Sequence, residues 1–351
     1  MKPLSINSCD VIAPNFKRRL SGVTSTIVRL VPLQAGMINI VSTGGGLPTH
    51  VPKVSVRQVL TMSRIGPSGP RVWHARRNIE MIGGLFLKHL LRKHLKLLFT
   101  SASQRHHTKL TKALIRRMDR VVSTSRKTAS FLERESTVIL HGIDTEAFCP
   151  PQDKAKVRAS LGLPETGFLV GCYGRIRAQK GTDVFVDAMV EVVKAHPDCT
   201  GIVMGRATSK DVDYENHLKR RVKQLGLSEQ IRFVPEVPVW DMPSWYQCLD
   251  VYVAPQRWEG FGLTPLEAMA CAVPVVATRV GAFEELVLDG VTGALIAPSD
   301  STAMAQKLRS LLDDPDALQK ASAAARAHVV ADFQIQKEAA ALIEVYRQML
   351  A

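Results

Sequence analysis

Glu259-Gly-Phe-Gly-Leu-Thr-Pro-Leu-Glu267 is the stretch of this 351-residue chain that decides its fold. The apolar run before it, residues 251–255, predicts a buried strand. Thr264 then predicts a helix to about Cys271, with Thr264 as the N-cap, proline at the first helical position and Glu267 completing a capping box. A strand, a glycine turn and a helix N-terminus form the arrangement with which α/β proteins bind phosphates and polarised sugars.

The two glutamates of this stretch differ in how well structure alone explains them. Capping accounts for Glu267 about as well as a function does. Glu259 precedes the cap, beside Trp258 and two glycines, where the loop has no structural need for a carboxylate. The pair is therefore a sharper sign of a binding site than either glutamate alone.

The rest of the second half alternates apolar strand patterns with amphipathic helix patterns, which predicts βα units and a parallel sheet. Its first strand-to-helix turn carries Arg175 and Lys180, each beside a glycine. Both cations can reach over the strand ends and would suit a diphosphate, although surface charge is the simpler explanation of each one alone. Gly205 and Arg206 end the next strand and form a weaker candidate for the same crevice.

Charge is distributed unevenly along the chain. Residues 1–150 hold 24 Lys or Arg and 7 Asp or Glu, a net charge of +17, whereas residues 151–351 have a net charge of −3. The basic half should meet an anionic partner: a phosphate-rich lipid surface, a nucleic acid or an acidic substrate. Residues 84–99 are apolar on one side and basic on the other. We favour contact of this segment with a membrane surface. A helix that covers the sheet and exposes its basic side to solvent is compatible with that contact.

Two segments of the basic half are candidate site elements. Asn15 to Val23 is a basic, glycine-bearing loop between a predicted strand and helix, which fits a phosphate cradle or an exposed loop. Val72-Trp-His-Ala-Arg-Arg-Asn78 lies at a strand end. His74 is as plausibly catalytic there as structural.

Several function classes lack support in the sequence. No apolar run approaches the ~20 residues of a membrane span, and the N-terminus has no signal-peptide core. The six cysteines are scattered, which predicts reduced thiols in a cytosolic protein without a zinc site. Asp211-Val-Asp213 indicates a helix start and not a metal site. Two prolines at 150 and 151 place a domain boundary near Pro151.

Taken together, the motifs resemble the retaining glycosyltransferases of family 4. The matching segments run in order along most of residues 141–298: His141-Gly-Ile-Asp-Thr, Gly174-Arg175, Lys180-Gly181, Glu259 to Cys271, Pro274-Val-Val-Ala-Thr and Asp289-Gly-Val-Thr-Gly. The resemblance implies the GT-B fold, in which two Rossmann-like domains with mostly parallel sheets face each other across a cleft. We expect an acceptor-side domain over 1–150, a nucleotide-sugar domain over 151–334, and a final helix, 335–351, crossing back to the first domain.

The basic half is similar to an alphaproteobacterial branch of this family, through Ala13 to Thr26 and Val72 to Asn78. That branch transfers mannose from GDP-mannose to the Kdo-containing inner core of lipopolysaccharide, which implies an enzyme at the cytoplasmic face of the inner membrane, held there peripherally. Two alternatives stay open: a UDP-sugar donor with another lipid-linked or cell-envelope acceptor, and a nucleic-acid-binding protein. The second is disfavoured because the basic half lacks interleaved aromatics and recognition motifs.

The family's roles, carried over by position and joined to the strand-end reasoning, define the candidate site. His74, beside the anomeric carbon, and Glu259, at the donor sugar's 3- and 4-hydroxyls, are the candidate catalytic residues. The candidate donor-binding residues are Gly22, Arg175, Lys180, Gly205, Arg206, Phe261, Gly262, Leu263, Thr264 and Glu267. The candidate acceptor-binding residues are Lys17, Arg18, Arg76 and Arg77. We expect no metal and no cofactor, and retention through an oxocarbenium-like state with attack from the departure face.

Overall fold

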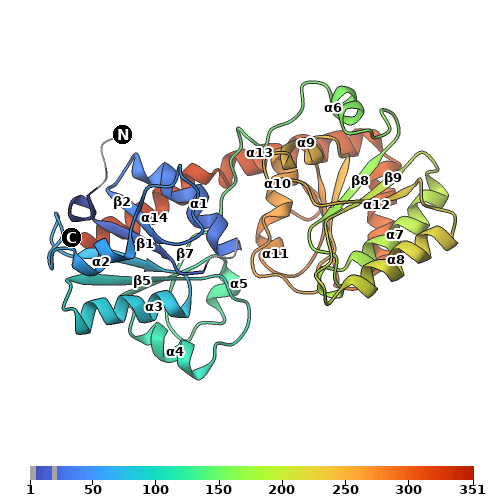
Figure 1. The fold of residues 1–351 in the computed structure, drawn as a ribbon. Coiled ribbons are helices and arrows are strands. Elements are labelled where there is room, and N and C mark those ends of the chain that lie inside the picture. The colour runs from blue at the N-terminus through green and yellow to red at the C-terminus, as the bar shows by residue number, and fades with distance from the viewer. Residues whose placement is uncertain (1–4, 18–21) are drawn as a thin grey trace. The chain divides into compact units, whose positions relative to one another are not determined.

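The computed structural model describes residues 5–17 and 22–351, and it divides the chain into two compact units. Unit 1 comprises Met1–His141 and Ile335–Ala351, and unit 2 comprises Gly142–Gln334. Each unit is built on one parallel sheet with helices on both faces (Figure 1). The predicted pair of parallel α/β sheets is thus confirmed.

Unit 1 has a seven-stranded sheet in the order β3-β2-β1-β4-β5-β6-β7. Its strands are β1 (Val11–Asn15), β2 (Ile40–Gly44), β3 (Lys53–Val54), β4 (Arg71–Ala75), β5 (Leu95–Ser101), β6 (Arg120–Ser123) and β7 (Thr137–Val138). Val11 is in register with Ile40 on one side and with Val72 on the other. Strand order reverses beside β1, so the ends of β1 and β4 form a switch point, where ligands bind in such sheets.

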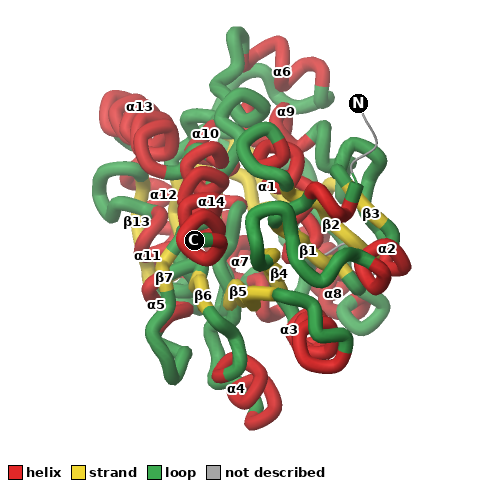
Figure 2. The backbone as a smooth tube through the Cα atoms, turned by 90° about the vertical axis from the view of Figure 1, so that its left-hand side faces the viewer, coloured by secondary structure: helices red, strands yellow, loops and turns green. Residues whose placement is uncertain are grey.

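Alternate side chains of these strands enter two apolar layers. One layer packs against α1 (Gly22–Ala35) and α14 (Ile335–Leu350). The other packs against α2 (Val56–Thr61), α3 (Asn78–Leu85) and α4 (Lys109–Arg116). A π-helical segment, Phe86–Leu90, continues α3. Figure 2 shows α3 and α4 on the same side of the sheet.

Unit 2 has a six-stranded sheet in the order β10-β9-β8-β11-β12-β13. Its strands are β8 (Leu169–Tyr173), β9 (Thr200–Met204), β10 (Ile231–Val234), β11 (Val251–Ala254), β12 (Val275–Thr278) and β13 (Gly293–Ile296). Its helices include α7 (Thr182–Ala195), α8 (Val212–Gln224), α9 (Met242–Gln247), α10 (Thr264–Ala270), α11 (Phe283–Leu286), α12 (Ser301–Leu312) and α13 (Pro315–Asp332). The switch point lies between β8 and β11, the strands that precede Arg175 and Glu259.

The division between the units falls earlier than the predicted boundary at Pro151. Ile143 N donates to Phe333 O at 2.7 Å, and Arg326 donates to the carbonyls of Thr145 and Phe148 at 3.1 and 2.9 Å. These bonds fasten residues 143–148 to unit 2. The two prolines therefore mark an irregular segment inside unit 2 and not its start.

Candidate active site

The turn after β8 is held by glycines that no other residue could replace without strain. Gly174 and Gly205 end β8 and β9 with φ of +133° and +147°. A Cβ on Gly205 would lie 1.8 Å from the Gly174 carbonyl oxygen. Because the two strand ends approach this closely, Arg175 and Arg206 are both exposed at the same edge of the sheet.

Lys180 is positioned by a second glycine contact. It ends the 3₁₀ turn Ala178–Lys180, and Gly181 follows in the left-handed region with φ of +70°. A Cβ on Gly181 would lie 1.9 Å from the Pro255 carbonyl oxygen, so glycine brings this turn against the end of β11. The Lys180 ammonium forms an ion pair with the Glu259 carboxylate. The structure therefore joins two predicted site residues that are far apart in the sequence.

The loop that carries Glu259 is equally constrained. The second carboxylate oxygen of Glu259 accepts a hydrogen bond from Gly260 N at 2.9 Å. Gly262 has φ of +87°, and a Cβ there would lie 2.3 Å from the ring of Phe283. Phe261 is buried, and its carbonyl accepts from Ala282 N at 3.2 Å. Glu259 is thus presented from a rigid turn.

The predicted capping box at Thr264 is wrong. Leu263 already has helical angles, with φ of −78° and ψ of −23°, so it is the N-cap residue and its side chain makes no capping bond. Glu267 Oε2 instead accepts from the Tyr246 hydroxyl at 2.7 Å. Burial, and next the charge of Glu267, raise the pKa of Tyr246 well above its usual value. The capping explanation for Glu267 is thus replaced by a contact with Tyr246, and its role in binding stays a prediction.

A pocket of about 460 Å³ adjoins the ends of β9 and β10, within the about 300–1,000 Å³ range of small-molecule sites. Gly205 and Arg206 line it, whereas Arg175, Lys180, Glu259 and Glu267 do not. The other lining residues are Ile176, Glu215, Lys219, Phe233, Val234, Pro235 and Glu236. The Lys219 ammonium lies 5.6 Å from the centre of the Phe233 ring, and Arg206 pairs with Glu236 at 3.2 Å.

An ion pair between the turns that follow β8 and β11 was not predicted from the sequence. The two terminal guanidinium nitrogens of Arg257, Nη1 and Nη2, contact the Asp183 carboxylate at 2.8 and 2.7 Å. The Tyr214 hydroxyl also donates to Asp183 at 2.8 Å, and Arg257 N donates to Gln179 O at 2.9 Å. The pair fastens the Lys180 turn to the Glu259 loop. An arginine two residues before Glu259 was a signal for it, but its partner lies 74 positions away.

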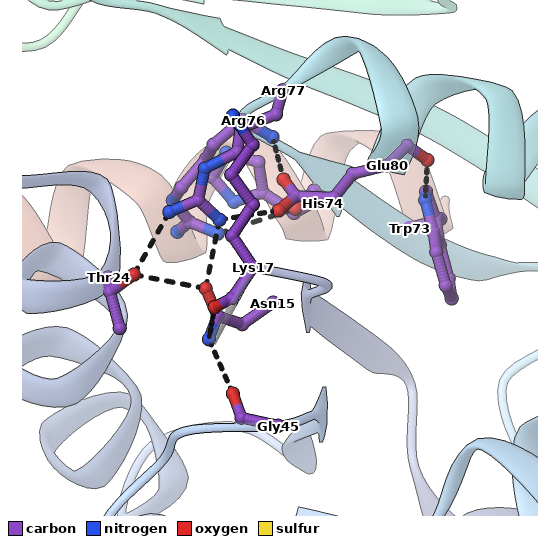
Figure 3. A network of polar contacts seen from close by, with 9 residues as sticks. All are labelled: Asn15, Lys17, Thr24, Gly45, Trp73, His74, Arg76, Arg77 and Glu80. Atoms are coloured by element: carbon purple, nitrogen blue, oxygen red, sulfur yellow. Dashed lines mark hydrogen bonds and ion pairs between the residues drawn. The ribbon is translucent and has the colours of Figure 1, made fainter. Parts of the chain in front are cut away.

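The switch point of unit 1 carries a polar network, drawn in Figure 3. Asn15, which ends β1, donates to Gly45 O at 2.8 Å and accepts from Thr24 of α1 at 3.2 Å. Arg77 donates to both Asn15 and Thr24 at 2.9 Å. The network fixes the loop after β1 to the end of β4. Asn15 and Thr24 are fully buried.

One carboxylate in this network contacts two adjacent arginines, the side chain of Arg77 and the backbone of Arg76. Glu80 is fully buried; one oxygen pairs with Arg77 at 2.8 Å and the other accepts from the backbone N of Arg76 at 2.8 Å. The Arg76 guanidinium donates to His74 O at 3.3 Å, and its Nη2 is buried without a hydrogen-bond partner among the described residues. Arg77 is therefore a positioning residue, and Arg76 carries the less compensated charge.

His74 does not occupy the exposed place that a catalytic role requires. It is fully buried in β4, with Nδ1 2.7 Å from the Tyr346 hydroxyl and Nε2 2.6 Å from Thr100 Oγ1. Burial, and next the charge of Arg76, lower its pKa well below 6.5. Both ring nitrogens are used in fastening β4 to α14 and β5. The geometry assigns His74 a structural role, and we correct the prediction accordingly.

The remaining predicted residues of unit 1 lie in the loop between β1 and α1. Lys17 is exposed, and its carbonyl accepts from Asn15 at 3.1 Å. Gly22 is the exposed first residue of α1, with open space where a Cβ would stand. Arg18 lies outside the described residues.

Two further observations concern the described ranges as a whole. Within residues 5–17 and 22–351, no three His, Cys, Asp or Glu side chains are grouped so that they could hold a metal ion. In the same part of the chain, no helix combines the length and apolarity needed to cross a membrane.

Known proteins resemble this chain in sequence and in fold. Residues 153–328 match the family model of glycosyl transferases group 1. The chain is 50% identical to the lipopolysaccharide core biosynthesis mannosyltransferase LpsB of Rhizobium meliloti (strain 1021), over 99% of each chain. It is 49% identical to the mannosyltransferase LpcC of Rhizobium leguminosarum bv. viciae, over 98% of each. Anabaena HepE, solved in complex with UDP, has the same fold, with a TM-score of 0.84 at 21% identity over 96% of this chain and 99% of that one. With a family match over half of its length and such identity over nearly all of it, this chain belongs to the group 1 glycosyltransferases, as its motifs predicted.

Proposed function

We propose that this protein transfers mannose from GDP-mannose, with retention, to the Kdo-containing inner core of lipopolysaccharide. The observation that carries the proposal is the extent of the similarity to LpsB, which covers 99% of both chains. The family model alone matches only residues 153–328, in unit 2. The basic unit therefore shares the relative's sequence as well, and it is the part from which we infer the acceptor class.

In the proposed donor site, Arg175 and Lys180 bind the diphosphate. Arg175 is exposed at the end of β8. Lys180 lies in the turn that Gly181 fixes at the same strand end. Glu259 accepts hydrogen bonds from donor-sugar hydroxyls, and its pairing with Lys180 holds sugar-binding and phosphate-binding groups in one geometry. Backbone N–H groups of Phe261 to Thr264 complete the contacts to sugar and phosphate.

The nucleoside would extend from the diphosphate toward Glu267 and the neighbouring pocket. Glu267 is anchored by Tyr246, which directs a carboxylate toward ribose hydroxyls. The pocket at Gly205 and Arg206 offers an aromatic face at Phe233 and polar groups at Glu236. A planar base with hydrogen-bonding edges fits a site of that composition.

The proposed chemistry places positive charge where negative charge develops. As the bond between the anomeric carbon and the phosphate oxygen breaks, the diphosphate gains charge, which Arg175 and Lys180 stabilise without reorganisation. The acceptor hydroxyl forms the new bond from the face of departure, through an oxocarbenium-like state, and its proton passes to the departing phosphate. Glu259 is not the nucleophile in this scheme because it is paired with Lys180 and binds hydroxyls.

Acceptor recognition belongs to the basic unit in this proposal. Arg76, Lys17 and Arg18 supply positive charge for a substrate rich in carboxylate and phosphate, with Arg77 supporting Arg76. An acidic acceptor at an anionic membrane surface also explains why the net charge of +17 is confined to residues 1–150.

A thermal-shift panel with GDP, UDP, ADP and their sugar conjugates tests the donor. A ligand at about 100 times its dissociation constant should stabilise the protein by about 2.7 kcal/mol. We expect stabilisation by GDP and GDP-mannose that is lost in Arg175→Ala. Preference for UDP would leave transfer intact but overturn the donor. Stabilisation by no nucleotide would overturn the donor site.

A transfer assay tests the acceptor and the stereochemistry. GDP-mannose and a Kdo–lipid A acceptor should give a mannosylated product whose anomeric configuration, read by NMR, is that of the donor. An inverted anomer would contradict retention. Salt-sensitive binding to an oligonucleotide that exceeds binding to lipid A vesicles would favour the nucleic-acid alternative.

A further inference from the structure

The outer face of α3 and its π-helical continuation carries an unpartnered apolar stripe. Four large side chains follow one another at spacings of three and four residues. Their exposed fractions are 49% for Ile79, 48% for Ile82, 44% for Phe86 and 68% for Leu90. At helical periodicity this spacing places all four on one side. We name these four residues the apolar stripe.

The stripe is not needed to pack the helix on the sheet. The opposite side of the same segment performs that function through Met81, Gly84 and Leu87, all buried. A Cβ on Gly84 would lie 2.6 Å from the Trp73 ring, which shows how closely that side approaches β4. The segment therefore has two apolar sides, and only one is covered in the described chain. Exposed apolar surface of this kind marks an interaction site.

The charge around the stripe identifies what covers it. Residues 86–117 contain nine Lys or Arg and four His, with no Asp or Glu. Two acidic residues from outside this range compensate part of the charge: Asp119 pairs with Lys88 at 2.8 Å, and Glu133 pairs with Lys112 and Arg116. Arg92 and Lys109 are exposed and have no acidic partner among the described residues. The surroundings of the stripe are thus strongly cationic.

The start of α4 extends this surface. Asn78 donates to Thr111 at 2.8 Å, which brings the first turns of α3 and α4 into contact. Leu110, 60% exposed, is the residue before Thr111. An apolar centre with a cationic surround is the composition of helices that lie in the interface of an anionic bilayer.

We propose that the apolar stripe, with Leu110 beside it, inserts into the surface of an anionic lipid bilayer. Apolar side chains enter the boundary of headgroups and acyl chains while Arg92 and Lys109 contact lipid phosphates. Arg77 is the N-cap of α3, so docking by the stripe holds the end of β4 near the headgroups. The benefit of that placement, access of the exposed Lys17 beside this strand end to a lipid-anchored anionic acceptor, rests on the proposed function; the docking itself does not.

Vesicle sedimentation of the full chain tests the docking. The probes are phosphatidylcholine vesicles and phosphatidylcholine vesicles with about 30% phosphatidylglycerol. Wild type should bind the anionic vesicles, and added salt should weaken binding. Ile82→Ser with Phe86→Ser should lower the partition coefficient at least about tenfold. The matched control is Val212→Ser with Leu225→Ser, at the first residue and the C-cap of α8 with 45% and 48% exposure, and it should bind like wild type.

Other results would contradict the proposed docking. Wild type that binds neither vesicle excludes a membrane partner, and a stripe variant that binds like wild type excludes the stripe. Tighter binding to an oligonucleotide than to vesicles assigns the basic surface to nucleic acid. If the double variant does not fold, Phe86→Trp serves instead: insertion requires its fluorescence to be quenched by brominated lipid. Stabilisation by GDP should persist in both double variants, so loss of donor binding is distinguishable from loss of docking.

Discussion

The two switch points of this protein carry similar numbers of cations and treat them differently. In unit 2, Lys180 pairs with Glu259 and Arg257 pairs with Asp183, while Arg175 has no acidic partner among the described residues. In unit 1, Glu80 pairs with the Arg77 guanidinium and accepts from Arg76 only through the backbone N, and burial lowers the pKa of His74 beside them. On each edge one arginine has no carboxylate partner in the described chain: Arg175, which is exposed, and Arg76, which is buried.

Different interactions make the two edges rigid. The turns of unit 2 are fixed by glycines pressed against backbone carbonyls, and their ion pairs are part-exposed. The edge of unit 1 is fixed by a buried network around the carboxylate of Glu80. Removing a carboxylate should therefore impair function in unit 2 and stability in unit 1.

The largest expected effect is on stability, from Glu80→Gln. This change leaves the buried Arg77 without its counter-charge, and breaking a buried pair in this way costs about 3–5 kcal/mol. Urea unfolding measures the loss. A loss below about 1 kcal/mol would show that the network of unit 1 does not depend on Glu80.

Glu259→Gln should reduce activity strongly and change stability little. Mannosyl transfer should fall at least about 100-fold because the sugar contact and the partner of Lys180 are both weakened. Stability should change by less than about 1 kcal/mol, since the pair is part-exposed. Steady-state kinetics and urea unfolding of one preparation separate the two effects; a stability loss equal to that of Glu80→Gln would remove the contrast between the units.

Two glycines with similar backbone angles test the packing of the donor-side turn. Gly181→Ala should destabilise the protein by about 2–4 kcal/mol because its Cβ would lie 1.9 Å from Pro255 O. Gly162→Ala is the matched control: its φ is +66° and a Cβ there meets open space, so about 1 kcal/mol is expected. Equal losses in thermal unfolding would show that backbone angle alone matters at Gly181.

The smallest expected effect is the pH dependence contributed by His74. Its pKa in the folded protein is lowered, so the unfolded chain binds a proton below about pH 6.5 while the fold does not. Stability should therefore fall as the pH drops below about 6.5, by up to about 1.4 kcal/mol per pH unit. Unfolding midpoints from pH 7.5 to 5 should show a shallower slope in His74→Gln. An unchanged slope would contradict a buried neutral histidine.

Much of the site could be predicted because local patterns encode it. Arg175, Lys180 and Glu259 each stand between a strand pattern and a helix pattern, and parallel strands bring such turns to one edge. The prediction that Glu267 completes a capping box was wrong because Leu263 already has helical backbone angles, which its residue type does not predict. His74 was misjudged because its position in the strand interior, between Tyr346 and Thr100, depends on segments distant in the sequence.

By itself, the sequence determined the two parallel sheets, the glycine turns and the uneven charge, because periodicity, left-handed backbone angles and net charge are local or additive properties. Only the tertiary structure decided which charges are compensated: Asp183 compensates Arg257, Glu259 compensates Lys180 and Glu80 compensates Arg77. It also decided which of two apolar sides of α3 is buried. The physical reason is that pairing and burial depend on side chains brought together from distant positions, and composition and spacing do not specify those contacts.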